Sequence, residues 1–350
     1  MALDNRQLWL RLFLPFAAGY FLSYLYRTAN AVIGPVLARD LGLGDNALGL
    51  LTSTYFLAFG AAQLPLGMLL DRFGPRRVEA ALLLIAAAGA ATFAWSDTLA
   101  GLAVGRALIG LGVSACLMAS FKAFSQWFPP ERQASLTGWI MASGGLGALA
   151  AAKPLELALG IAGWREIVLA LAVITVLVAA ALWWFVPDKP NAGKGAGLAE
   201  QFSGVKQIFV SRHFWRYAPL GFWLTGGFMA VQGLWATRWM NVIEDMEPAA
   251  IAVRLTWISA AMLAGFLFMG FFATGLVRRG IKLENVYLGA MATAIAALAA
   301  LTFFPTFGGN LLWPLLGVCF SLSNIAYSLV AQAFPPALSG RANTALNLLV

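Results

Sequence analysis

The chain has 350 residues, of which 61% are hydrophobic and only 11% are charged, and its formal net charge is +8. Soluble domains carry about 25% charged residues, and the mean hydropathy here is +0.78, so the composition excludes a water-soluble domain. Apolar runs of about 20 residues, long enough to cross a hydrocarbon core of about 30 Å as a helix, recur along the whole chain. We therefore expect an all-α polytopic membrane protein.

Ten complete membrane spans are predicted, and their content of Ala, Gly and Leu favours packed helices over the alternating strands of a barrel. In chain order they cover residues 13–37, 48–70, 79–96, 99–127, 134–159, 165–186, 216–241, 251–277, 283–304 and 309–333. An eleventh begins near residue 340 and is cut off at Val350, so we expect a truncated or atypical chain. The first ten residues do not have the pattern of a cleavable signal peptide.

Basic residues gather in alternate loops, on the side of the membrane that holds the amino terminus. The opposite loops clearly contain only Arg39 and Arg165. By the positive-inside rule, the amino terminus is predicted to be cytoplasmic, in a cell (inner) membrane. The excess positive charge is thereby explained by orientation, and we do not expect nucleic-acid binding.

The chain repeats itself on either side of a long polar interval. WFPPERQASLTG at residues 127–138 recurs as AFPPALSGRANT at 333–344, and the Pro-Pro pairs are 206 residues apart. GMLLDRFGPRR at 67–77 has a weaker echo in GFFATGLVRRG at 270–280. These echoes indicate duplication of a six-helix unit. The predicted domains are an amino-terminal six-helix bundle at 1–186, a cytoplasmic linker at 187–215, and a carboxy-terminal bundle at 216–350, which stops within the eleventh helix of the chain.

The run GMLLDRFGPRR resembles the loop between the second and third helices of the major facilitator superfamily, which has the form G-x-x-x-D-R-x-G-x-R-R. The matching residues are Gly67, Asp71, Arg72, Gly74, Arg76 and Arg77. GRALIGLG at 105–112 is similar to the fourth-helix motif of the same superfamily, in which Arg106 would be a structural or proton-relay group. The resemblance implies a secondary transporter, not an enzyme, built from two pseudo-symmetric six-helix bundles.

The same resemblance implies a conformational latch in the loop, formed by Gly67, Asp71, Arg72 and Arg76, that steadies the outward-facing state. Asp71 could meet a helix amino terminus or an arginine. The alternative is a cluster that only sets topology. A topological anchor needs basic residues but neither the acid nor the glycines, so the latch is the favoured interpretation.

Ionisable residues within the spans are the strongest functional signal, because each costs several kcal/mol unless a partner or ligand compensates. Arg27 lies near the middle of the first span, on a polar stripe with Tyr20, Ser23, Tyr24 and Asn30. We expect Arg27, helped by Tyr24, to contact an anionic substrate. The alternative is an arginine bonded to backbone carbonyls.

At helical rise, Lys122 lies about 9 Å inside the fourth span. It is either a second cation of the cavity or a lysine whose side chain snorkels to the cytoplasm. We place the acids in loops or at helix ends, apart from Glu156, and predict no carboxylate at the centre of the membrane. An interior with cations and no deep carboxylate favours an anionic passenger.

The first-helix run SYLYRTANAVIGPVL also resembles that of the organophosphate:phosphate antiporters and related organic-anion carriers. Those antiporters add a second arginine on the seventh helix, where the repeat offset places Gln232 here. A carboxylate or sugar acid is therefore favoured over an organophosphate. Trp235, Asn324 and Tyr327 are further candidates for the substrate site, each with packing as the alternative.

We predict no cofactor and no metal site, because the single histidine, His213, lies in the linker without ligand spacing to other residues. The expected partners are a small anionic solute, a coupling ion (a proton or a counter-anion, in symport or antiport) and the lipid bilayer, around a monomer. One competing hypothesis is a proton-coupled drug or metabolite exporter, which needs a buried titrating carboxylate. Another is a membrane sensor or assembly protein that transports nothing.

Overall fold

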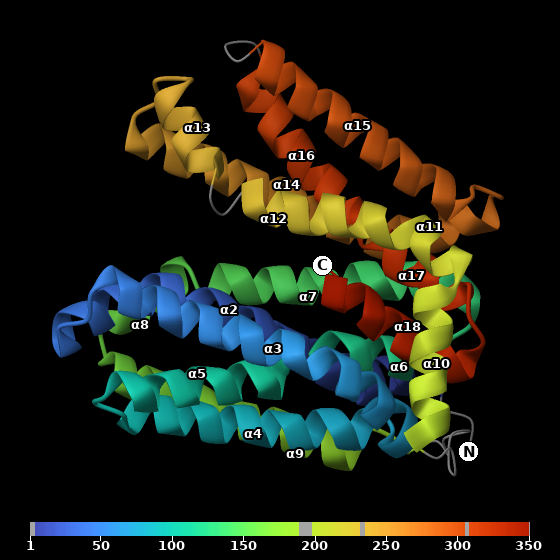
Figure 1. Ribbon diagram of the computed structural model, residues 1–350, viewed down its shortest axis with the longest axis horizontal. Coiled ribbons are helices and arrows are strands. Elements are labelled where there is room, and N and C mark those ends of the chain that lie inside the picture. The colour runs from blue at the N-terminus through green and yellow to red at the C-terminus, as the bar shows by residue number, and fades with distance from the viewer. Residues whose placement is uncertain (1–3, 189–197, 232–234, 305–307, 350) are drawn as a thin grey trace. The chain divides into compact units, whose positions relative to one another are not determined.

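The computed structural model describes residues 4–188, 198–231, 235–304 and 308–349, and all regular elements within them are helices (Figure 1). Eight of these helices are long and apolar enough to cross a membrane, or nine when the bent α3 is counted. The all-α prediction is confirmed. The predicted seventh span, 216–241, includes residues 232–234, which lie outside the described ranges.

The chain divides into two compact units. One unit comprises Met1–Trp127 with Ser143–Ser203, and the other comprises Phe128–Ala142 with Gly204–Val350. The predicted linker is not wholly irregular, because α10 (Leu198–Val210) occupies part of it. The domain boundary proposed from the sequence stays a prediction.

The first unit is built around α4, which packs against α5 and α9, while α3 packs against α5 and α2 packs against α9. Its helices are α1 (Asn5–Gln7), the π-helix η1 (Leu8–Phe13), α2 (Leu14–Leu41), α3 (Asp45–Phe73), α4 (Pro75–Trp95), α5 (Leu99–Val113), α6 (Cys116–Trp127), α8 (Lys153–Leu159) and α9 (Trp164–Phe185). The short η2 (Pro130–Arg132) and α7 (Gln133–Ala150) follow α6, and α7 is shared between the units.

Small residues allow α4 and α5 to approach closely. A Cβ added to Gly112 would lie 2.3 Å from the backbone nitrogen of Ala86, and one added to Gly105 would lie 2.7 Å from that of Phe93. Within a membrane, helices gain little from the hydrophobic effect and associate through such close backbone packing. These glycines therefore determine how α4 and α5 pack.

Two local breaks shape the first unit. The helix α3 bends by 53° where Gln63 meets Pro65, because a proline inside a helix removes one hydrogen bond and clashes with the preceding turn. The predicted fourth span is interrupted between α5 and α6, at Ser114 and Ala115. The structure thus interrupts the middle of a span that appears continuous in the hydropathy pattern.

The second unit has α14 packed against α16, α15 against α16, and α17 against both α11 and α18. Its helices are α11 (Arg212–Gly221), the π-helix η3 (Phe222–Gly226), α12 (Gly227–Ala230), α13 (Ala236–Val242), α14 (Pro248–Arg278), α15 (Leu283–Phe303), α16 (Gly309–Ser323), α17 (Ile325–Gln332) and α18 (Pro336–Leu349). The predicted tenth span breaks at Asn324, 210 positions after Ser114. Because this separation is close to the 206 residues between the Pro-Pro pairs, the matched breaks support an internal duplication.

Candidate functional site

Arg27 lies on α2 among aromatic rings contributed by two helices. Its guanidinium carbon is 4.8 Å from the ring centre of Tyr24, 5.0 Å from that of Phe59 and 6.0 Å from that of Phe56. Within the described residues, the buried Nε of Arg27 has no hydrogen-bond partner. The cation is therefore surrounded by ring faces, each such contact being worth about 0.5–2 kcal/mol, and its Nε remains available to a ligand.

Tyr55, on α3, lies between two arginines. Its side chain is fully buried, its hydroxyl group is next to Arg27, and its ring centre is 4.8 Å from the guanidinium carbon of Arg106. Neither Tyr55 nor Phe59 was predicted from the sequence to belong to the site. Their i, i+4 spacing on the second span places them on one helix face, but the spacing does not reveal that this face meets Arg27.

Arg106, on α5, is bonded to the backbone of two neighbouring helices. Its Nη1 donates to the carbonyl of Tyr26 at 3.2 Å, and its Nε donates to the carbonyl of Leu51 at 3.5 Å. The side chain thereby ties α5 to α2 and α3. These contacts favour the structural role over the proton-relay role, a choice that the sequence left open.

The break between α5 and α6 lies beside this cluster, and neighbouring helices satisfy its exposed carbonyl groups. Ser23 Oγ donates to the carbonyl of Val113 at 3.4 Å, and Gln63 Nε2 donates to the carbonyl of Ser114 at 3.4 Å. Irregular backbone at membrane depth is tolerated where protein buries it or where it lines a cavity. In transporters, discontinuous helices of this kind mark substrate sites.

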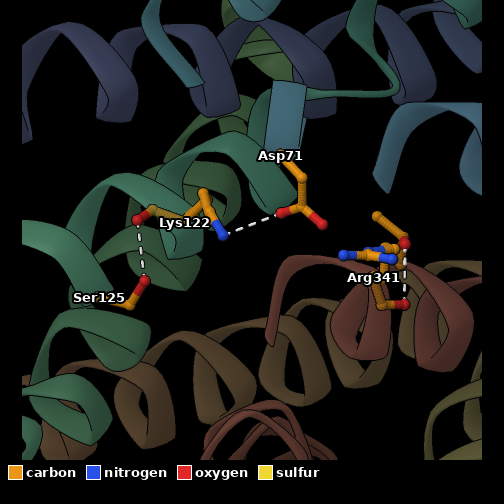
Figure 2. Close-up of polar contacts among 5 residues, drawn as sticks. Asp71, Lys122, Ser125 and Arg341 are labelled. Atoms are coloured by element: carbon orange, nitrogen blue, oxygen red, sulfur yellow. Dashed lines mark hydrogen bonds and ion pairs between the residues drawn. The ribbon is translucent and has the colours of Figure 1, made fainter. Parts of the chain in front are cut away.

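Lys122, on α6, forms an ion pair with Asp71 at the end of α3, as Figure 2 shows. The Nζ–Oδ1 distance is 2.9 Å, and the side chains are only 8% and 9% exposed. This contact with the signature loop was not predicted, and the two predicted roles of Lys122, the cavity cation and the snorkelling lysine, stay predictions. The acid of that loop thus meets a lysine of the fourth span, and the predicted contacts with a helix terminus or an arginine stay predictions.

The basic residues of the loop have separate contacts. Arg72 is exposed and lies over the ring of Phe73, whereas Arg76 lies 5.6 Å from the ring centre of Trp183. Arg77 pairs with Asp188 at 2.6 Å on the surface. Gly67 is buried within α3, and Gly74, with a positive φ of 84°, joins α3 to α4. The predicted latch residues thus lie around one helix junction, and their role as a latch stays a prediction.

The candidates from the second half are less well supported by their surroundings. Gln232 lies outside the described residues. Trp235 is 62% exposed. Asn324 donates to the carbonyl groups of Phe320 and Ser321 at 3.4 Å each, at the break between α16 and α17. Tyr327 donates to Oδ1 of Asn347 at 2.7 Å. Asn324 and Tyr327 are buried and engaged within their own unit, which favours packing as their role.

Glu79 is the largest departure from the acids expected from the sequence. As the fifth residue of α4 it lies near a helix end, yet its side chain is completely buried. Glu156, which we expected within a helix, lies in α8 but is exposed. Glu79 follows the arginine pair of the loop so closely that its position resembles a surface turn. The apolar run VEAALLL around it is the signal that could have revealed its burial.

Comparisons of the sequence with known proteins give one family match and several related transporters. A family model described as the Major Facilitator Superfamily matches residues 16–350. The chain is 26% identical over 172 residues to a probable sulfoacetate transporter of Cupriavidus necator, covering 49% of this chain and 40% of that protein. It is 24% identical over 294 residues to a probable L-galactonate transporter of Escherichia coli K12, covering 77% of this chain and 60% of that protein. The chain thus spans less than two thirds of the length of these curated relatives.

A solved structure, the E. coli fucose:proton symporter, has the same fold. It superposes with a TM-score of 0.73 at 17% sequence identity, covering 97% of this chain and 89% of that structure. At this identity the likeness concerns the fold alone. The predicted similarity to the organophosphate:phosphate antiporter branch stays a prediction.

Proposed function

Because the chain belongs to the major facilitator superfamily, we propose that it is a secondary transporter that moves a small organic anion by alternating access. Arg27 is the principal contact for the anion in this proposal. The passenger is a carboxylate or a sugar acid, and an organophosphate fits less well. The chain is oriented with its amino terminus in the cytoplasm, as the distribution of basic residues predicts.

The single observation that carries this proposal is the state of the Arg27 guanidinium. It lies in the middle of a membrane helix, surrounded by Tyr24, Phe56 and Phe59, and its Nε has no hydrogen-bond partner within the described residues. An ionisable side chain at this depth is costly and marks a functional site. A carboxylate would accept two parallel hydrogen bonds from it, which are stronger and more directional than neutral ones.

The number of available cations supports a monoanion or a sugar acid. Arg106 donates to backbone carbonyls, and Lys122 is paired with Asp71. Arg27, which makes none of these contacts, is therefore the favoured contact for the anion among these three cations, although Nη2 of Arg106 also has no hydrogen-bond partner within the described residues. L-Galactonate, in the name of one relative, is a sugar-acid monoanion, whereas sulfoacetate, in the name of the other, carries a sulfonate in addition to its carboxylate.

The pair formed by Lys122 and Asp71 has a second place in the proposal. It links the end of α3 to α6, and α6 continues from the break beside Cys116 near the Arg27 cluster. A buried ion pair with one preferred geometry gives a junction two discrete states, intact or separated. We assign this pair, with Gly67, to the conformational latch of the transport cycle.

One observation favours the competing hypothesis of a proton-driven exporter of drugs or metabolites. That hypothesis requires a buried carboxylate that changes its protonation state, and Glu79 is a buried carboxylate. The two hypotheses differ in their dependence on Arg27, because an exporter of neutral or cationic compounds does not need that cation and should tolerate Arg27→Gln.

The test is a ligand panel on the purified protein. Thermal unfolding in detergent is measured with L-galactonate, sulfoacetate, D-glucuronate, lactate and inorganic phosphate, for the wild type, Arg27→Gln and the control Arg39→Gln, at an exposed arginine of α2. We expect at least one carboxylate to stabilise the wild type and the control but not Arg27→Gln. Stabilisation that persists in Arg27→Gln would move the anion site elsewhere. A wild type that responds to none of these anions would favour the exporter or a sensor that transports nothing.

A further inference from the structure

Glu79 is enclosed by protein and carries no ordinary hydrogen bond. Its exposed fraction is 0%, and neither oxygen of its carboxyl group has a hydrogen-bond partner within the described residues.

The space for this carboxyl group is provided by a glycine of α2. A Cβ at Gly19 would lie 2.2 Å from Oε1 of Glu79 and 3.8 Å from Cδ1 of Leu83. Gly19 is therefore the wall against which the acid rests, and any movement of α2 relative to α4 would change the exposure of the acid to water.

The charged and titratable groups around Glu79 can be traced helix by helix. From α6, the Cys116 thiol lies beside the carboxyl group, and Lys122, farther along, is paired with Asp71 of α3. From α9, the nearby end carries Trp183, against which Arg76 of α4 packs. On α2, Arg27 is two turns beyond Gly19. The remaining such groups on these helices and on α5 are Tyr20, Tyr24, Tyr26, Arg39, Asp40, Asp45, Tyr55, Arg72, Arg77, Arg106, Arg165 and Glu166. None of the described basic side chains makes an ion pair with Glu79.

An ionised carboxylate without a donor or a counter-charge is very costly inside a protein, whereas the neutral acid loses far less on burial. The environment of Glu79 therefore matches its protonated form. If α2 and α4 part at Gly19, water can take the proton, the O–H bond breaks, and a solvated carboxylate remains. Protonation is thus tied to a conformational change.

We propose that Glu79 is the proton-binding site of this transporter. The inference rests on the proposed transport of an organic anion, and it names the proton as the coupled ion. The anion and the proton then travel in the same direction.

The coupling follows from charge. Arg27 lies two turns along α2 from Gly19, the residue against which the carboxyl group of Glu79 rests. An ionised Glu79 would offset part of the positive field at Arg27 and weaken binding of an anion there. A protonated Glu79 leaves that field intact. Binding of the proton and of the anion therefore favour each other, and by linkage the effect is reciprocal.

The first experiment detects the proton without a ligand. The infrared spectrum of the purified wild type at neutral pH should contain the C=O stretch of a neutral carboxyl group. This band should shift when the water is replaced by deuterated water. Glu79→Gln, which has nearly the same shape, should lack this band, whereas Glu166→Gln, at an exposed position on α9, should keep it. The absence of the band from the wild type, or its persistence in Glu79→Gln, would overturn the proposal.

The second experiment measures linkage and transport with L-galactonate as the probe. In the wild type, affinity should fall as pH rises, and in proteoliposomes an imposed gradient of about one pH unit, worth about 1.4 kcal/mol, should drive about tenfold accumulation. In Glu79→Gln, affinity should be high and independent of pH, exchange of internal for external L-galactonate should continue, and accumulation should be lost.

These outcomes separate the two proposals. If the wild type neither binds nor exchanges L-galactonate or the other anions of the panel, the proposed function fails, and the infrared band still decides whether Glu79 holds a proton. If Glu79→Gln still accumulates L-galactonate under a pH gradient as the wild type does, anion transport stands and the assignment of Glu79 is wrong. If Glu79→Gln does not exchange L-galactonate and its unfolding midpoint differs from that of the wild type, the variant is misfolded. Glu79→Asp is then tested: recovery of accumulation supports the assignment of Glu79, and failure to recover it in a folded protein contradicts the assignment.

Discussion

The ammonium group of Lys122 lies 2.9 Å from Oδ1 of Asp71, and both side chains are more than nine-tenths buried. The two residues are 51 positions apart, one in the signature loop and the other on the fourth span. Burying two charges is tolerable because each satisfies the other. The contact therefore explains why an acid stands in a loop whose other charges are basic.

Removing one partner of this pair should cost more than removing both. Lys122→Met leaves a buried carboxylate without its lysine and should lower the free energy of unfolding by about 3–5 kcal/mol, whereas Lys122→Met combined with Asp71→Leu should cost far less. Chemical denaturation in detergent micelles measures both values. Arg77→Gln, which removes half of an exposed pair, is the control and should change stability by at most about 1 kcal/mol. Equal losses in the single and double variants would contradict the coupling.

The shape of the Arg27 head group should matter as well as its charge. Arg27→Lys keeps a cation but loses the planar fork, so affinity for the best carboxylate of the panel should fall by about tenfold or more. Phe59→Leu removes one ring face from the cation and should cost about 0.5–2 kcal/mol of stability. Tyr24→Phe keeps the ring and should differ little in stability. Isothermal titration gives the affinities, and full affinity in Arg27→Lys would show that a point charge suffices.

The sequence predicts the parts of this site that lie along one helix better than the parts that several helices share. The helical spacing of Tyr20, Tyr24 and Arg27 predicts a polar stripe, because that periodicity is local. The rings of α3 that cover Arg27 were missed, since hydropathy does not tell which face of one span meets another. Glu79 was missed for a related reason, because its burial depends on Gly19, 60 positions earlier in the chain.

The same limit explains why the ion pair of Lys122 was not predicted. The depth of Lys122 in its span follows from its distance to the Pro-Pro pair, but its partner depends on how separate helices pack. By contrast, the all-α membrane class and the family could be predicted, because long apolar runs and a short motif are properties of the chain alone. The break between α5 and α6 could not, since both sides of it are equally apolar.

The close contact between α4 and α5 should be sensitive to single methyl groups. Gly112→Ala places a Cβ 2.3 Å from the backbone nitrogen of Ala86, and such overpacking should destabilise the protein by about 1–3 kcal/mol. Gly60→Ala, in α3, meets no atom within 4 Å and should be neutral or stabilising, because alanine is the better helix former. Thermal unfolding of the two variants makes the comparison, and equal midpoints would contradict the packing described for α5.

Neutralising Arg106 should lower the stability of the protein, whereas neutralising Arg27 should remove its response to the ligand. Arg106→Met removes two charge-assisted hydrogen bonds to the carbonyls of Tyr26 and Leu51, each worth about 1.5–3 kcal/mol, so it should lower the midpoint of unfolding. The variant should still be stabilised by the carboxylate that stabilises the wild type, because the guanidinium of Arg27 remains. Arg27→Gln should lose the response to the ligand, and its midpoint should change less than that of Arg106→Met, because it loses the ring contacts but also the cost of holding a cation within the membrane. Thermal unfolding with and without the carboxylate measures both effects. If Arg106→Met also loses the ligand response at a temperature where it is folded, both arginines belong to the anion site, and a dianion becomes the better passenger.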